Sequence, residues 1–199
     1  MINLEKAKEE FLKYTSNYDV EHPKIHKKVT HSLRVCDISG KIAEGLNLDN
    51  EQIELAKLIG LLHDIARFEQ FTRFGTYNDL VSIDHGQLGV EILENDQYIR
   101  KYIEDDQYEN IIKKAIKNHN AYSIEDGLNE EEILHSKIIR DSDKIDILYQ
   151  ISEFYKKGED RYLNEEKISQ EVYEQFYNKQ IIDNRFKITK LDGIIGVVS

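Results

Sequence analysis

Apolar residues recur every three to four positions along most of this chain, which is the period of an α-helix. The repeat begins with Leu4, Ala7, Phe11 and Tyr14. No segment shows the strict alternation of a half-buried strand, so we predict an all-α fold. The other predicted helices cover residues 23–40, 48–67, 84–95, 108–119, 130–157 and 170–182.

Local signals support two of these starting points. Pro23 suits the first turn of a helix, where its missing N–H is not needed. Asp49 and Gln52 form a capping-box pattern ahead of the next apolar repeat. The helix predicted over 130–157 is apolar on two sides, which indicates a central position in the fold.

The domain organisation predicted from the pattern is simple. One Pro, 10 Gly and the lack of any low-complexity linker or repeat indicate a single domain over residues 1–199. The chain closes on the apolar run KITKLDGIIGVVS. We expect this run to pack on something, with part of a final helix missing or belonging to a partner.

Composition narrows the function classes. The net charge is −11 and no dense block of Lys and Arg occurs, so we expect no nucleic-acid polymer as a partner. No apolar stretch approaches the roughly 20 residues that cross a bilayer, and the N-terminus lacks a signal-peptide pattern. The single Cys36 excludes an internal disulfide. We predict a cytoplasmic protein, to which a small anionic substrate could still bind at a local cation.

Several titratable residues fall on the apolar faces of different predicted helices. In GLLHDIARF, His63 and Asp64 stand inside an apolar run, where unpaired polar groups cost several kcal/mol. The others are His31, His85, His119 and the acids Asp141, Asp143 and Asp146. Imidazoles and carboxylates that converge on one core need a counter-charge, and a metal ion binds both ligand types. We therefore predict a metal site, and we interpret His22, His26 and His135 as structural or solvated.

The order His31, His63–Asp64, Asp143 resembles the H…HD…D signature of the HD-domain metal-dependent phosphohydrolases. The segments THSLRV, LLHDIARF and IIRDSDKIDI are similar to the family's ligand-bearing segments. His85 and His119 resemble the extra histidines of the subset with two metals. That subset includes HD-type dinucleoside tetraphosphate hydrolases and cyclic-dinucleotide phosphodiesterases. The resemblance covers about residues 25–150 and implies an HD-domain helical bundle, followed by a C-terminal helical region over about 151–199.

The resemblance implies a role for each matching residue. A first metal would be bound by His31, His63, Asp64 and Asp143, with Asp143 preferred to Asp141 because the family's ligand directly precedes a basic residue. Asp64 would also bridge to a second metal held by His85 and His119. These two histidines could instead serve as acid/base or phosphate contacts beside a single ion.

Two basic residues near these positions are candidates for the substrate phosphate. Lys144 directly follows Asp143, and Arg67 follows Asp64 by one turn. The alternative for Lys144 is a salt bridge with Asp141, and the alternative for Arg67 is a surface arginine at the end of a helix. The polar segment 71–84 is a candidate substrate-contacting loop, with a plain connection as its alternative.

The predicted function is that of a metal-dependent phosphohydrolase with catalytic residues Asp64, Arg67 and Lys144. It would be a phosphomonoesterase, a phosphodiesterase or a nucleotide pyrophosphohydrolase acting on a small, nucleotide-type substrate. One or two divalent ions would serve, with Mn²⁺, Fe²⁺ and Co²⁺ suiting the ligands better than Mg²⁺, and Ni²⁺ or Zn²⁺ left open. The alternative is a non-catalytic HD-type module that binds a ligand or a protein. A homo-oligomer is left open.

Overall fold

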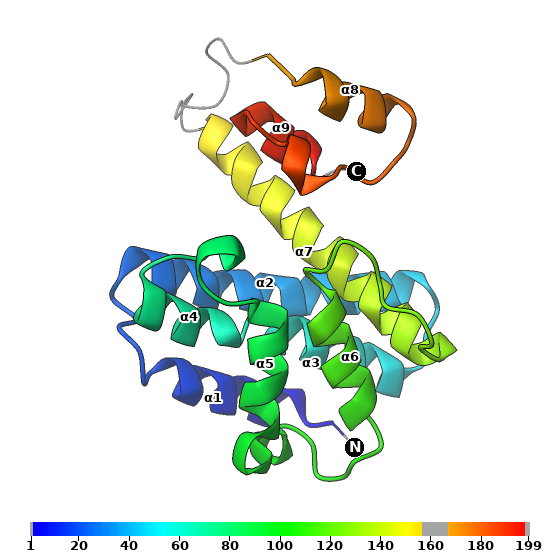
Figure 1. Cartoon of the computed structure of the whole chain (residues 1–199). Coiled ribbons are helices and arrows are strands. Elements are labelled where there is room, and N and C mark those ends of the chain that lie inside the picture. Colours follow the sequence, from blue (N-terminus) through cyan, green and yellow to red (C-terminus); the bar gives the residue numbers. More distant parts are fainter. Residues whose placement is uncertain (1, 157–166, 198–199) are drawn as a thin grey trace. The chain divides into compact units, whose positions relative to one another are not determined.

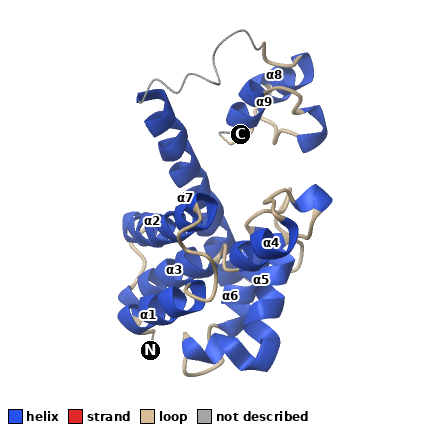
Figure 2. Ribbon diagram, turned by 90° about the vertical axis from the view of Figure 1, so that its left-hand side faces the viewer, coloured by secondary structure: helices blue, strands red, loops and turns tan. Residues whose placement is uncertain are grey.

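The computed structural model describes residues 2–156 and 167–197 and contains only helices and loops within them (Figures 1 and 2). The predicted all-α fold is confirmed. Longer helices are α1 (Leu4–Thr15), α2 (Pro23–Gly45), α3 (Asn50–Leu62), α4 (Ala66–Phe74), α5 (His85–Glu94), α6 (Glu109–Asn118) and α7 (Glu130–Lys156). Shorter ones are η1 (Asp79–Val81), η2 (Asn95–Lys101), α8 (Gln170–Tyr177), η3 (Asn184–Phe186) and α9 (Lys190–Ile195). No described helix is long and apolar enough to cross a membrane.

The chain divides into two compact units, residues 1–143 and residues 144–199. The single domain expected from the sequence stays a prediction. In the second unit, Val172 of α8 and Ile182 are buried, and Asp192 accepts hydrogen bonds from Ser169. The predicted helix over 170–182 ends earlier, at Tyr177, and the last two residues of the apolar end lie outside the described residues.

The core of the first unit surrounds α3, which contacts α1, α2 and α6 (Figure 1). Seven of its residues between Leu55 and Leu62 are buried. Gly60 lets α3 approach α2 closely, because a Cβ atom there would lie 2.6 Å from Ser39 Oγ and 2.8 Å from the Val35 carbonyl oxygen. Because α2 also carries His31, the close approach of α3 to α2 helps to bring His31 and His63 together.

The single helix predicted over 48–67 is wrong in one respect. The structure ends α3 at Leu62 and begins α4 at Ala66, with a turn between them. Hydrogen bonds of the i to i−3 type mark this turn, from Ile65 N to Leu62 O and from Arg67 N to Asp64 O. Neighbouring residues on an α-helix point about 100° apart. Across this turn, His63 Nε2 and Asp64 Oδ2 nevertheless lie 3.5 Å apart, so the two side chains face one point.

Candidate metal centre

Six side chains from different elements of the first unit converge beside this turn. His63 caps the C-terminus of α3, and Asp64 follows in the turn. The others are His31 of α2, His85 at the start of α5, His119 at the C-terminal cap of α6, and Asp143 of α7. Asp143 is partly exposed and the other five are buried. All six residues predicted as metal ligands are therefore brought together.

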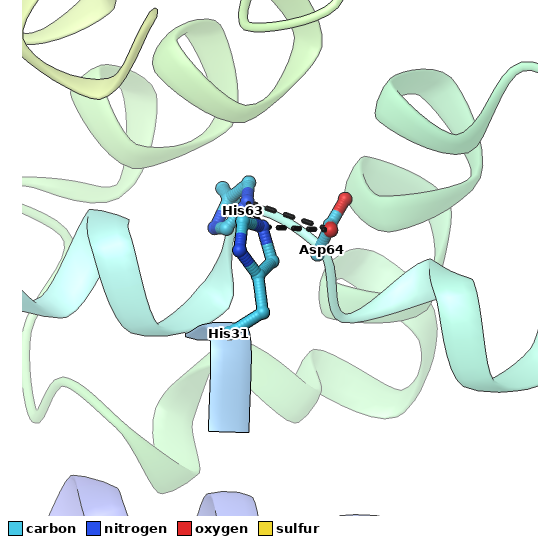
Figure 3. A group of neighbouring side chains, drawn as sticks. All are labelled: His31, His63 and Asp64. Carbon is cyan, nitrogen blue, oxygen red and sulfur yellow. Dashed lines mark hydrogen bonds and ion pairs between the residues drawn. The ribbon is translucent and has the colours of Figure 1, made fainter. Parts of the chain in front are cut away.

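The first group consists of His31, His63 and Asp64 (Figure 3). The two histidine Nε2 atoms lie 3.2 Å apart. Asp64 Oδ2 lies 3.4 Å from His31 Nε2 and 3.5 Å from His63 Nε2. Asp143 Oδ1 adds a second carboxylate oxygen, 3.1 Å from His31 Nε2 and 3.7 Å from His63 Nε2.

The second group uses the other oxygen of the same carboxylate. Asp64 Oδ1 lies 3.4 Å from His85 Nε2 and 3.6 Å from His119 Nε2. The Nε2 atoms of these two histidines are 2.9 Å apart. Asp64 thus presents Oδ2 to one pair of imidazoles and Oδ1 to the other pair.

The other ring nitrogen of three of these histidines faces an acceptor. His63 Nδ1 lies 2.8 Å from the Gly60 carbonyl oxygen, and His119 Nδ1 lies 2.6 Å from the Ile116 carbonyl oxygen. His85 Nδ1 lies 2.5 Å from Asp79 Oδ2. Acceptors at these positions hold the proton on Nδ1 and leave the lone pair on Nε2, which is the arrangement of metal-binding histidines.

The spacing of the ligand atoms fits a cation in each group. Two atoms that each lie about 2.1 Å from one ion are about 3.0 Å apart at a right angle and about 3.4 Å apart at a tetrahedral angle. The distances within the two groups, 2.9 to 3.6 Å, fall around these values. Lone pairs that face each other at this distance repel unless a cation lies between them, so the donor set fits divalent ions.

The charged forms of the acids are strongly favoured. Burial alone would raise the pKa of Asp64, but Lys28 and His63 hold it well below its ordinary value. Burial is likewise outweighed at Asp143, whose pKa is held well below its usual range by His31 and His63. Both carboxylates are therefore available to a cation at neutral pH.

Burial favours the neutral form of two of the imidazoles, His63 and His85. Burial lowers the pKa of His63, and it lowers the pKa of His85 to about 4. A neutral imidazole is the form that binds a metal. Protons therefore compete weakly for these two ligands near pH 7.

The alternative interpretation of Arg67, a surface arginine at the end of a helix, is wrong. Arg67 lies in the first turn of α4, and only 14% of its side chain is exposed. Arg67 Nε lies 3.3 Å from Asp64 Oδ1, while Nη1 donates to Asp79 Oδ1 and to the Tyr77 carbonyl oxygen. The guanidinium is thus fixed at the edge of the centre. Its role toward a substrate stays a prediction.

The three acids of α7 that the sequence singled out lie in different surroundings. Asp141 is exposed, so a solvated face explains it, whereas Asp143 contacts the histidines. Asp146 is buried and accepts a hydrogen bond from Gln150 within the second unit. Lys144 is the first residue of the second unit, and its role toward a substrate stays a prediction.

Two residues of the centre were not predicted from the sequence. Lys28 Nζ donates to Asp64 Oδ2 over 2.6 Å and lies 5.5 Å from the centre of the Tyr77 ring. Asp79 contacts both Arg67 and His85 from the segment between α4 and α5. Lys28 precedes His31 by three residues, so helical spacing could have placed it beside that ligand. No local pattern marks Asp79.

The remaining histidines are placed outside the centre. His22 caps the N-terminus of α2, and His26 is exposed on the same helix. His135 is buried, and its Nε2 lies 2.6 Å from Gln52 Oε1. The Gln52 side chain also donates to Glu131, so it does not return to Asp49, and only the Asp49 half of the predicted capping box forms.

His135 makes stability depend on pH. Burial lowers its folded-state pKa to about 4, below the unfolded value of about 6.5. Between these values the unfolded chain binds a proton that the folded chain excludes, so the free energy of unfolding falls by about 1.4 kcal/mol per pH unit on acidification. We expect His135→Gln to reduce the slope of the unfolding free energy against pH by about 1.4 kcal/mol per pH unit, which corresponds to one proton. Urea unfolding from pH 7 to pH 5 in the presence of chelator measures this slope. An unchanged slope would contradict the assignment, and His26→Gln is the control.

Comparison with known protein families identifies the chain. The family model of the HD domain matches residues 29–148, which is more than half of the chain and includes all six residues of the centre. Searches against curated proteins and against solved structures gave no match. The residues that match the model include the adjacent His63 and Asp64 at the shared point of the two groups. The chain belongs to the HD domain family.

Proposed function

We propose that this protein is a metal-dependent phosphohydrolase that cleaves a phosphate ester or phosphoanhydride of a small, nucleotide-type substrate. Membership of the HD domain family, whose members are usually hydrolases, supports the reaction class. The observation that carries the proposal is the Asp64 carboxylate, whose two oxygens face two separate groups of imidazoles. A small substrate agrees with the net charge of −11, which disfavours a polyanion.

The residues of the centre would hold one or two divalent ions. The first group with Asp143 offers two imidazoles and two carboxylate oxygens, and the second offers two imidazoles and the other oxygen of Asp64. When bound, such ions supply Lewis acidity toward a phosphoryl oxygen and make water a stronger nucleophile. Mixed imidazole and carboxylate ligands suit Mn²⁺, Fe²⁺ or Co²⁺ better than Mg²⁺.

The chain's own cations would orient the phosphate. Lys28 and Arg67 both contact the Asp64 carboxylate, from the side of Oδ2 and of Oδ1 respectively. Positive charge fixed at these points is available to the phosphoryl oxygens as negative charge develops on them. Lys144 is a further candidate for this role. The segment with Tyr77 lies against both Lys28 and Arg67, so it would bound the substrate on that side.

The test is an assay of the metal-loaded full chain with a panel of nucleotides, dinucleoside polyphosphates and p-nitrophenyl phosphate esters. We expect turnover of at least one substrate in Mn²⁺, and its loss with chelator. His31→Ala should abolish turnover, because it removes a ligand of the first group. His26→Ala, on an exposed position of the same helix, should leave turnover unchanged.

A different outcome would favour the non-catalytic alternative. If no ester or anhydride is cleaved by chain shown to contain metal, and His31→Ala folds as well as wild type, the hydrolase proposal fails. A nucleotide bound without turnover would then identify a binding module.

A further inference from the structure

The carboxylate of Asp79 receives four side-chain donors, which come from α4, from α5 and from the loop after α6. Asp79 lies at the start of η1, in the segment between α4 and α5. Its Oδ1 accepts hydrogen bonds from Arg67 Nη1 at 2.9 Å and from Gln70 Nε2 at 2.8 Å. Its Oδ2 accepts from His85 Nδ1 at 2.5 Å and from Asn120 Nδ2 at 3.1 Å. Each oxygen is thus committed to its own pair of donors.

The donors at Oδ1 cannot exchange roles. A guanidinium only donates hydrogen bonds, so Arg67 requires an acceptor there. The buried Gln70 accepts from Arg67 through its own Oε1 at 2.7 Å, which fixes Nε2 as the donor. Gln70 Nε2 donates also to Ser82 Oγ at 2.9 Å. The side of Asp79 that faces α4 must therefore remain an acceptor.

We propose that Asp79 is a positioning residue that sets the tautomer of His85 and thereby decides whether the second group, Asp64, His85 and His119, can hold a cation. Asp79 Oδ2 holds the proton on His85 Nδ1, which leaves the lone pair on Nε2 beside Asp64 and His119. The inference rests on the metal-binding part of the proposed function and not on hydrolysis.

The proposal predicts an unusual order of two variants. In Asp79→Asn, Arg67 and Gln70 hold the amide oxygen on their side, so the amide N–H₂ group faces His85 Nδ1. A donor there requires Nδ1 to accept, which moves the imidazole proton to Nε2 and removes the metal-binding lone pair. In Asp79→Ala, water can accept from Nδ1–H, and the Asn120 amide, whose Nδ2 lies 3.3 Å from Nδ1, can turn its oxygen toward the ring, so the tautomer is retained. The isosteric variant is therefore the more harmful one.

A merely structural role gives the opposite order. Asp79→Ala removes all four hydrogen bonds, whereas Asp79→Asn keeps two of them, so stability alone would suffer more in the Ala variant. Melting temperature measures this structural cost separately. Ser82→Ala is a matched control, because it removes a hydrogen bond of Gln70 to the same segment and leaves the contact between Asp79 and His85 intact.

The experiment titrates the metal-free full chain with Mn²⁺ by calorimetry, with ion counts by elemental analysis. We expect two ions per chain in wild type and in Ser82→Ala. In Asp79→Asn the first ion should bind normally and the second about 10- to 100-fold more weakly, a larger loss than in Asp79→Ala. Long-range ¹⁵N–¹H spectra of the metal-free protein should show the His85 proton on Nδ1 in wild type and on Nε2 in Asp79→Asn.

The possible failures are separable. Equal binding of the second ion by Asp79→Asn and wild type, or weaker binding by the Ala variant than by the Asn variant, overturns the inference. If wild type binds only one ion, the two-ion centre of the proposed function fails, and the spectra still decide on the tautomer. An unchanged His85 tautomer in Asp79→Asn overturns the inference by itself.

Discussion

Asp64→Asn is expected to reduce phosphate-ester hydrolysis at least about 10³-fold and to weaken metal binding at both groups. The substitution removes the one charge that the groups share, and it replaces one of the two acceptor oxygens by a donor. An amide can therefore face at most one group with an oxygen. Loss of the ions removes several kcal/mol of charge stabilisation in the transition state, and each 1.4 kcal/mol is a factor of ten in rate. Steady-state kinetics in Mn²⁺ and elemental analysis of the variant measure the two effects.

The control for this prediction is Asp141→Asn. Asp141 lies on α7 near Asp143 but is exposed, so its substitution changes the same net charge without touching the centre. Its ion content and rate should match wild type. Retention of both ions and of at least a tenth of the rate by Asp64→Asn would show that this carboxylate is not the shared ligand.

Metal binding is expected to raise the melting temperature of the chain by about 8–16 °C. The ligands come from α2, the turn after α3, α5, α6 and α7, so they converge only in the folded state. An ion at a thousand times its dissociation constant then adds about 4 kcal/mol to the free energy of unfolding. For a chain of this size each kcal/mol shifts the melting temperature by about 2–4 °C. Thermal unfolding followed by circular dichroism, with Mn²⁺ and with chelator, measures the shift.

Two variants make the melting comparison specific. His135→Gln should keep the full shift, because His135 is buried outside both groups. His63→Ala should lose most of it, because His63 presents Nε2 to the first group. A shift of less than about 2 °C in wild type at saturating Mn²⁺ would count against a preformed centre.

Helices such as α1 and α6 could be predicted because each of them buries a single face. The apolar period of α1 is carried by Ala7 and Phe11, both buried, and Pro23 opens α2 as its fixed φ angle favours. The starts of α5 and α6 were likewise predicted to within one residue. These features depend on local sequence alone, so periodicity and capping residues were sufficient.

The break between α3 and α4 could not be predicted in this way. The apolar repeat continues through Ile65 and Ala66, and neither Gly nor Pro interrupts it at residues 63–65. At the turn, Asp64 lies against Lys28 of α2, which is a tertiary contact between residues far apart in the sequence. Such contacts override helical periodicity and leave no mark in the local pattern.

The six residues of the centre were predicted because each is a titratable group on an apolar face, and because their order along the chain matches the signature of the HD-domain family. The choice of Asp143 over Asp141 also came from the resemblance, since the helical pattern alone left both open. Asp79 was missed for a physical reason. Its function depends on the donors that surround it, from Arg67 to His85, and these meet only when α4, α5 and the segment between them are folded.

The turn at residues 63–65 also determines where the chain can tolerate a change of length. Adding or removing one residue there would change the direction in which α4 leaves α3 and would move Asp64 and Arg67 relative to the ligands on the other helices. The connection over 123–129, between α6 and α7, carries none of the six residues and no buried residue, so it could lengthen or shorten without moving a ligand. Insertions and deletions among natural variants of this chain should therefore occur in such connections and not at the three residues that join α3 to α4.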